Sequence, residues 1–287
     1  MNEISAELYS TTLIDKDYRD VIFESIDILK NLNRKFDLII DIGCAEGGLT
    51  KLLAKHVPHK QIVAIDVVPD LISFAEKHNN DQSIDYKLAD MSVDWEQLPS
   101  SITKLKETVD LVFSSFTLHY MKDKQQVMNL IWKLLAPGGI FYGNLCCIPD
   151  LNKKLLPKDN DNNSIDDNWY PTVENQMKDY EQALAVNGFV VEKFNRIDKV
   201  WETNRKDVIE MMPVLFNDYK LFYPKPMDQF DKEFRTNMLD IVFNAYTSPA
   251  NEPPVPNAWQ QFLANDNIQE LKVYTTYLQV VAKKLEN

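Results

Sequence analysis

The stretch Asp41-Ile-Gly-Cys-Ala-Glu-Gly-Gly48 decides the fold, because it stands where an apolar run gives way to a helical pattern. The residues before it, Phe36–Ile42, are nearly all apolar, which is typical of a central parallel strand buried on both faces. Gly43, Ala45 and Gly47 would let the backbone approach a ligand closely, and the start of the next helix would present free N–H groups to it. A tight turn also needs glycine on steric grounds alone, so the stretch by itself allows either interpretation.

The pattern on both sides of this stretch extends the prediction to the whole fold. Apolar residues at helical spacing over residues 18–32 predict a helix that covers the sheet. Downstream, strand patterns alternate with helix patterns, as a parallel sheet requires. We therefore predict an α/β fold, doubly wound around a seven-stranded, mostly parallel sheet. The expected strands include residues 61–65, 109–114, 140–146, 189–197 and 274–282, and the expected helices include 49–53, 71–75 and 125–135.

Composition excludes several classes of function. The chain has 43 acidic and 31 basic residues and a net charge of -12, which repels a phosphate backbone, so we expect no nucleic-acid partner. It has no apolar run long enough to span a membrane and no pattern of a signal peptide, so we expect a soluble, cytoplasmic protein without a membrane span. Three cysteines and four histidines never fall at zinc-ligand spacing, and the Asp- and Asn-rich residues 159–168 lack the glycine and glutamate of a calcium loop. We predict no metal site.

A second carboxylate points to a nucleoside ligand. Asp66 ends the next predicted strand, 19 residues beyond Gly47, where its oxygens could accept hydrogen bonds from both hydroxyls of a ribose. A nicotinamide cofactor remains possible, because Gly43, Ala45 and Gly48 fit a degenerate GxGxxG. Three other features disfavour it. They are the aspartate two residues before the first glycine, Asp90-Met91 after a third strand segment, and Ala136-Pro-Gly-Gly139 between a helix and a strand.

In this order, these features resemble the class I S-adenosylmethionine-dependent methyltransferases, whose fold is Rossmann-like. The resemblance implies S-adenosyl-L-methionine as cofactor. It places the methionine part at Asp41, Gly43 and Gly47, the ribose and one adenine face at Asp66 and Val67, and the adenine at Asp90 and Met91. Ala45 departs from the usual glycine by one methyl group. Arg19 could neutralise the cofactor's carboxylate, although an exposed helical arginine is the commoner case. The whole expected cofactor set is Arg19, Asp41, Gly43, Cys44, Ala45, Gly47, Asp66, Val67, Asp90, Met91 and Ser114.

A narrower resemblance is to insect juvenile hormone acid methyltransferases and related trans-aconitate methyltransferases. It is carried by Leu8-Tyr9 with Arg19-Asp20, by the segment from Phe113 to Tyr120, and by the closing strand from Tyr274. It implies O-methylation of the carboxylate of an apolar terpenoid or fatty acid, such as farnesoic or juvenile hormone acid. Two positions depart from the family: Tyr120 stands where it has a tryptophan, and Asp17 lies near its substrate-facing glutamine. An aspartate there would repel a carboxylate.

His119 and Tyr120 are the expected catalytic residues, because they follow the fourth strand, where a parallel sheet delivers groups toward a ligand. His119 could orient the acceptor or take a proton from it, or it could be a structural histidine. Tyr120 could donate a hydrogen bond or simply be a half-buried tyrosine. Two other classes stay open: a nicotinamide-dependent oxidoreductase and a non-catalytic S-adenosylmethionine-binding protein.

The expected domain organisation follows from the long interval before the last strand. Residues 1–35 form an N-terminal covering helix region, 36–200 the S-adenosylmethionine-binding core, 201–272 a helical substrate cap and 273–287 the final strand of the core sheet. Apolar and aromatic residues between Met211 and Tyr223 could line a pocket for the acceptor, although such a run more often packs a core. The expected partner is a small-molecule acceptor.

Overall fold

A computed structural model describes residues 17–147, 172–210, 212, 232–248 and 252–286. The chain divides into two compact units. Of the described residues, those in 17–146, Asp179–Arg196 and 278–286 form the sheet unit, and those in 147–178 and Ile197–Tyr277 form the cap unit. The four domain boundaries expected from the sequence remain a prediction.

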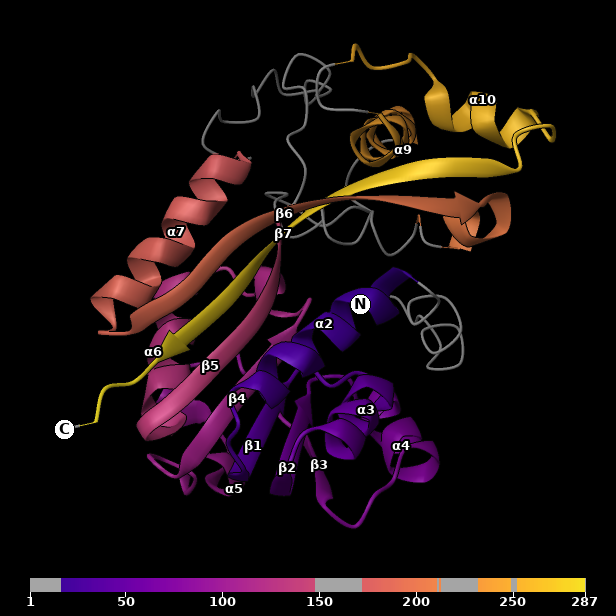
Figure 1. Cartoon of the computed structure of the whole chain (residues 1–287). Coiled ribbons are helices and arrows are strands. Elements are labelled where there is room, and N and C mark those ends of the chain that lie inside the picture. Colours follow the sequence, from indigo (N-terminus) through magenta and orange to yellow (C-terminus); the bar gives the residue numbers. More distant parts are fainter. Residues whose placement is uncertain (1–16, 148–171, 211, 213–231, 249–251, 287) are drawn as a thin grey trace. The chain divides into compact units, whose positions relative to one another are not determined.

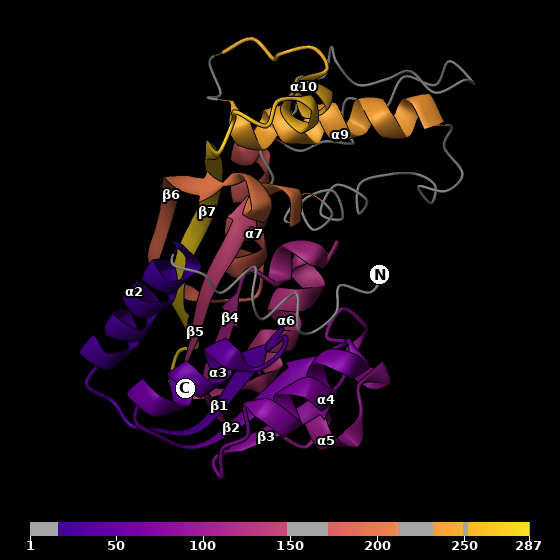
Figure 2. The same cartoon turned by 90° about the vertical axis from the view of Figure 1, so that its right-hand side faces the viewer.

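The sheet has seven strands in the order β3-β2-β1-β4-β5-β7-β6, which confirms the predicted fold class. The neighbouring strands β3, β2, β1, β4 and β5 run parallel to one another. From β1 the chain moves outward through β2 to β3, and then returns to the other side of β1 with β4 (Figure 2). The strand order therefore reverses between β1 and β4, and in sheets of this type ligands bind at the carboxyl ends of the strands where the order reverses. The strands are β1 (Phe36–Ile42), β2 (His59–Asp66), β3 (Ile84–Leu88), β4 (Val109–Ser115), β5 (Leu135–Cys147), β6 (Val190–Asn204) and β7 (Glu270–Lys283).

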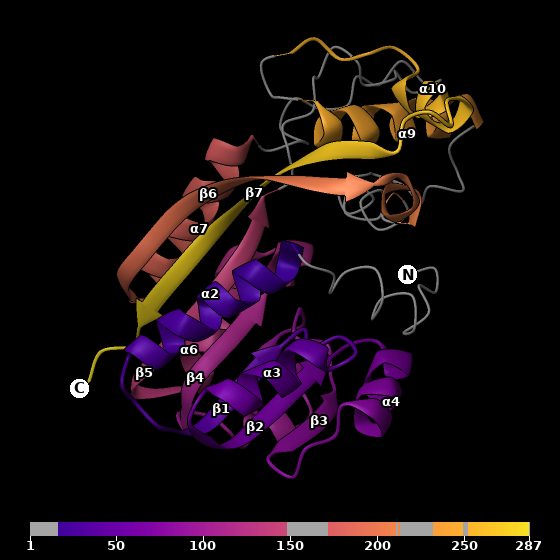
Figure 3. The same ribbon diagram turned by 45° about the vertical axis from the view of Figure 1, so that its right-hand side comes forward.

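Three helices of the sheet unit, α2 (Asp17–Asn31), α3 (Gly48–His56) and α4 (Pro69–His78), cover one face of the parallel strands (Figure 3). Ile26 of α2 and Leu53 of α3 belong to one buried cluster with Ile39 of β1, which confirms the predicted covering helix. Phe141 of β5 points to the opposite face, where it meets Phe189. That face carries α5 (Ser100–Thr103) and α6 (Lys124–Leu134). The helix α7 (Val173–Val186) follows in the sequence, and its residues from Asp179 onward belong to the sheet unit.

Several strands are longer than the sequence predicts. β5 begins at Leu135, so the Ala136-Pro-Gly-Gly139 segment expected to link helix and strand lies inside the strand. Gly138, with a φ of 72°, permits this irregular start, and its N–H donates to the carbonyl of Lys284 after β7. β6 and β7 continue to Asn204 and from Glu270, into residues expected to be helical. The cap interval is therefore not all helical.

The cap unit nevertheless contains the expected helices. α9 (Lys232–Thr247) and α10 (Ala258–Ala264) lie side by side (Figures 1 and 2). The ring of Phe243 contacts those of Trp259 and Phe262, at centroid distances of 5.4 and 5.2 Å. Between Met211 and Tyr223, only Met212 has a described side chain, and it is buried. The other expected pocket residues lie outside the described part of the chain, as do residues 159–168.

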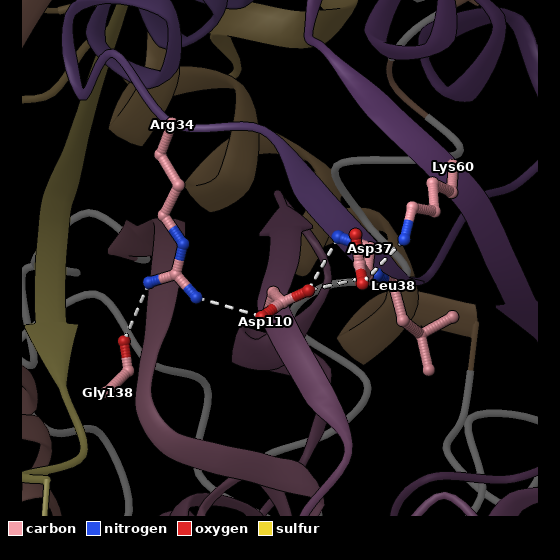
Figure 4. A network of polar contacts seen from close by, with 6 residues as sticks. All are labelled: Arg34, Asp37, Leu38, Lys60, Asp110 and Gly138. Atoms are coloured by element: carbon pink, nitrogen blue, oxygen red, sulfur yellow. Dashed lines mark hydrogen bonds and ion pairs between the residues drawn. The ribbon is translucent and has the colours of Figure 1, made fainter.

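A carboxylate fastens the amino-terminal ends of the parallel strands, at the edge opposite the loop that follows β1 (Figure 4). One oxygen of Asp110, in β4, accepts the backbone N–H groups of Asp37 (2.6 Å) and Leu38 (3.1 Å) in β1. The other oxygen pairs with Arg34 at 2.8 Å, and Arg34 also donates to the carbonyl of Gly138. This network sets β1, β4 and the start of β5 in fixed register.

No described helix combines the length and apolar character that crossing a membrane would take. Within the same ranges, no group of three or more His, Cys, Asp or Glu side chains could hold a metal ion.

Candidate functional site

The loop after β1 is held in left-handed backbone conformations. Gly43 and Gly47 have φ values of 80° and 82°, and Ala45, which replaces the usual glycine, has a φ of 48°. A Cβ atom on Gly43 would lie 2.0 Å from the hydroxyl of Thr117, and one on Gly47 would lie 2.4 Å from the hydroxyl of Tyr86. The protein's own side chains therefore occupy the space beside both glycines. The two glycines are required for packing as well as for backbone conformation.

Asp41, at the end of β1, is a buried carboxyl group at the floor of this loop. It is 1% exposed, and one of its oxygens accepts a hydrogen bond from Thr50 of α3 at 2.6 Å. Burial raises its pKa from 3.8 to about 7, and the charges of Asp66 and Glu46 act in the same direction. Its carboxyl group is thus only partly ionised near neutral pH. A cationic group placed beside it would pull it to the charged form.

Asp66, at the end of β2, connects two loops. One carboxylate oxygen accepts the N–H of Ala45 at 3.0 Å, and the other accepts the N–H of Val68 at 2.9 Å. Burial raises the pKa of Asp66, although these amide hydrogen bonds oppose the shift. The next residue, Val67, is 45% exposed. An apolar side chain beside a fixed carboxylate suits the base and the ribose of a nucleoside.

Asp90 follows β3, the third of three adjacent strands. Its carboxylate is exposed and accepts hydrogen bonds from the N–H (2.8 Å) and hydroxyl (2.6 Å) of Ser92, while Met91 is buried. The structure therefore places Asp41, Asp66 and Asp90 at the carboxyl ends of β1, β2 and β3, as expected. Asp41 and Asp66 lie close enough for their charges to interact.

The remaining expected cofactor residues have varied surroundings. Cys44 is buried, and burial raises the pKa of its thiol, which keeps it unreactive. Ser114 is fully buried, and its hydroxyl donates to the carbonyl of Ile42 at 2.9 Å, which ties β4 to β1. Arg19 lies in the first turn of α2, where the structure does not describe the side chain. Contact of these residues with the cofactor stays a prediction.

The expected catalytic residues lie in a short 3-10 turn after β4, η2 (Leu118–Tyr120). His119 is 7% exposed, and its Nδ1 has no hydrogen-bond partner among the described residues. Burial, followed by the charge of Lys124, lowers its pKa from 6.5 to about 3, so the ring is neutral at pH 7. The ring of Tyr120, which is 39% exposed, lies 4.0 Å from that of His119 between centroids.

The sequence patterns did not single out four residues of this region: Glu46, Thr50, Thr117 and Lys124. Glu46 is buried, and its side chain accepts the N–H of Gly48 at 3.2 Å. Thr117 enters the loop after β1 from a distant part of the chain, so no local pattern could reveal it. Thr50 could have been suspected, because a residue in the first turn of a helix faces back toward the strand that precedes it.

The sequence-family model of a methyltransferase domain matches residues 33–188, which are more than half of the chain. The chain therefore belongs to this methyltransferase family, and the resemblance to class I S-adenosylmethionine-dependent methyltransferases drawn from the sequence is confirmed. S-adenosyl-L-methionine is the cofactor of that class. The pair of Asp41 and Asp66 around a glycine loop suits a nucleoside that carries an amino acid.

Individual relatives are more distant. Juvenile hormone acid O-methyltransferase of Bombyx mori is 30% identical over 105 residues, which are 36% of each chain. O-methyltransferase 3 of Dictyostelium discoideum is 25% identical over 256 residues, 86% of this chain and 56% of that protein. The chain thus spans between about a third and just over half of the length of these curated relatives. A candidate methyltransferase from Bacillus halodurans C-125 has the same fold, with a TM-score of 0.56 and 15% identity over 93% of this chain and 99% of that one.

Proposed function

We propose that this protein is a small-molecule O-methyltransferase that transfers the methyl group of S-adenosylmethionine to the carboxylate of an apolar acid. S-adenosylmethionine, when bound, would supply a methyl group on a sulfonium. The acceptor oxygen would form a bond to the methyl carbon, and the electron pair of the broken carbon–sulfur bond would stay on sulfur. The residues of the cofactor site are those described above. Asp41 would pair with the amino group of the cofactor, and Asp66 would accept the ribose hydroxyls.

The observation that carries the choice of acceptor is the burial of His119, which is 7% exposed, because this burial lowers the pKa of its ring. A base whose conjugate acid has a pKa of about 3 takes a proton from an alcohol very poorly. A carboxylate already carries its charge near pH 7 and needs no base. A neutral imidazole can still orient it, because one ring nitrogen carries a proton that it can donate. His119 thus supports an acceptor that arrives ionised, and the juvenile hormone acid O-methyltransferase similarity points the same way.

Matched acceptors test this proposal. The full chain is incubated with labelled S-adenosylmethionine and with pairs that share one carbon skeleton, such as farnesoic acid with farnesol and a fatty acid with its alcohol. Tricarboxylic acids complete the panel. We expect label in the apolar acids only. Equal labelling of the alcohols would contradict the proposed acceptor, and cofactor binding without any turnover would favour a non-catalytic binding protein.

Variants of His119 separate orientation from proton transfer. His119→Gln keeps a hydrogen-bond donor but cannot accept a proton at neutral pH, so we expect it to retain more activity than His119→Ala. A loss of hydrogen bonding to a charged acceptor corresponds to about 1.5–3 kcal/mol, or roughly ten- to a hundredfold in rate. If the glutamine variant were as inactive as the alanine variant, His119 would be acting in another way.

A further inference from the structure

The turn that carries His119 and Tyr120 has little stability of its own. It is a single 3-10 turn of three residues, and no side chain caps its amino-terminal end. Short 3-10 segments have poor hydrogen-bond geometry, so they rely on contacts from outside. Something else must hold this turn if its two side chains are to meet an acceptor reproducibly.

Lys124 supplies that contact. Its ammonium group donates to the carbonyl oxygens of Leu118 and His119, both at 3.1 Å, and to that of Met121. An ammonium group has three protons, and two carbonyls of the turn and one directly after it accept hydrogen bonds from this group. From its other side, the ring of Tyr180 in α7 lies 5.1 Å from the same nitrogen, a favourable cation–π distance. The lysine therefore binds the turn to α6 and α7.

The position of Lys124 in α6 indicates that its ammonium group stabilises the turn and not the helix. It is the first residue of α6, where the positive end of the helix dipole disfavours a cation. The helix is already capped by Asp123, whose carboxylate accepts the N–H of Gln126 at 2.9 Å. The cap of α6 is thus supplied by Asp123, whereas the hydrogen bonds of the Lys124 ammonium described above go to the turn and the residue after it.

We propose that Lys124 is a positioning residue for methyl transfer: its ammonium group ties the carbonyls of the η2 turn together and so fixes His119 and Tyr120 toward the acceptor. This inference rests on the proposed function, in which those two side chains meet the acceptor. The charge of the same ammonium also helps to keep the His119 ring neutral, because it lowers the pKa of that ring further than burial alone.

Lys122 and Lys124 give a matched test. Lys124→Met keeps most of the side-chain volume and removes the ammonium, whereas Lys122→Met removes the same charge from an exposed position two residues away. For the acid of the panel that is methylated fastest, we expect Lys124→Met to lower kcat/KM about tenfold or more. The affinity of Lys124→Met for S-adenosylhomocysteine should stay within about twofold of that of the unaltered protein. Lys122→Met should change neither kcat/KM nor this affinity. Lys124→Arg, which keeps the charge in a planar fork, should recover part of the rate.

Other results would overturn the proposal. If Lys124→Met behaved as Lys122→Met does, the contacts of Lys124 would have no role in the reaction. If Lys124→Met lost cofactor affinity and turnover in equal measure, the lysine would be a general structural support.

Hydrogen exchange keeps this test independent of the acceptor. The amides of Tyr120 and Met121 donate to the carbonyls of Thr117 and Leu118 within the turn. Their exchange should be about tenfold faster in Lys124→Met and unchanged in Lys122→Met. Failure of the unaltered protein to methylate any acid would refute the proposed function, and exchange would then decide on Lys124. Equal exchange rates in the two variants would refute the positioning role.

Discussion

Cofactor affinity should depend on pH through Asp41. If the cofactor's amino group binds the ionised carboxylate, the apparent dissociation constant equals the intrinsic one multiplied by 1 + 10^(pKa − pH). With the pKa of Asp41 at about 7, this factor is about 11 at pH 6 and about 1.1 at pH 8. Affinity should therefore fall about tenfold from pH 8 to pH 6, with up to about one proton released on binding at the lower pH.

Isothermal titration with S-adenosylhomocysteine measures both quantities without turnover, and two buffers of different ionisation enthalpy count the protons. Asp41→Asn should bind more weakly and lose the pH dependence. Glu46→Gln is the control, because burial also raises the pKa of Glu46, while a glutamine can still accept the N–H of Gly48. A change in affinity of less than about twofold over this pH range would refute the reasoning. A dependence that survives in Asp41→Asn would assign it to another group.

Three further predictions concern stability. Gly43→Ala should destabilise the fold by about 2–4 kcal/mol and abolish cofactor binding, because its Cβ would overlap Thr117 at a left-handed φ; an unchanged denaturation midpoint would contradict this. Asp110→Ala should cost about 2–3 kcal/mol in urea denaturation, whereas Asp37→Ala, which removes only an exposed ion pair, should cost under about 1 kcal/mol; equal losses would mean that the network of Figure 4 is not cooperative. Asp41→Asn should stabilise the unliganded protein at pH 8 but not at pH 4. The pKa of Asp41 in the folded protein lies above its usual value of 3.8, so ionisation of this carboxyl group destabilises the fold progressively from about pH 4 to 7, by at most about 4 kcal/mol. If the difference in denaturation midpoint between Asp41→Asn and the original protein did not change with pH, this reasoning would be wrong.

Local patterns made the centre of the site predictable. Asp41 and Gly43 stand at the junction of a buried strand and a helix, and a strand of that kind shows itself by its apolar run. Asp66 can be placed at the end of the next strand, because one helix and one strand of ordinary length separate it from the glycine loop. These features are set by residues near one another in the chain, so the sequence alone shows them.

Other features depend on contacts between distant residues or on exposed strands. Thr117, which follows β4, fills the space beside Gly43. The residues near Gly43 in the sequence do not predict this contact. β6 was expected to end at residue 197, but it continues to Asn204 with mostly exposed or half-buried side chains, so it lacks the apolar signal of a strand. The long β5 contains Pro-Gly-Gly, which usually marks a turn, because the irregular pairing at Gly138 tolerates it.

The two hydrogen bonds accepted by Asp66 have a consequence for anyone who tries to redesign this enzyme for altered nucleosides. Each oxygen restrains a different loop, through Ala45 on one side and Val68 on the other. In the proposed cofactor site, exchanging Asp66 to change the preferred sugar would therefore also release the loop that is proposed to receive the amino-acid end of the ligand. Under that proposal, selectivity for the sugar and for the amino-acid end of the ligand would be linked, so a redesign would have to replace both loops together.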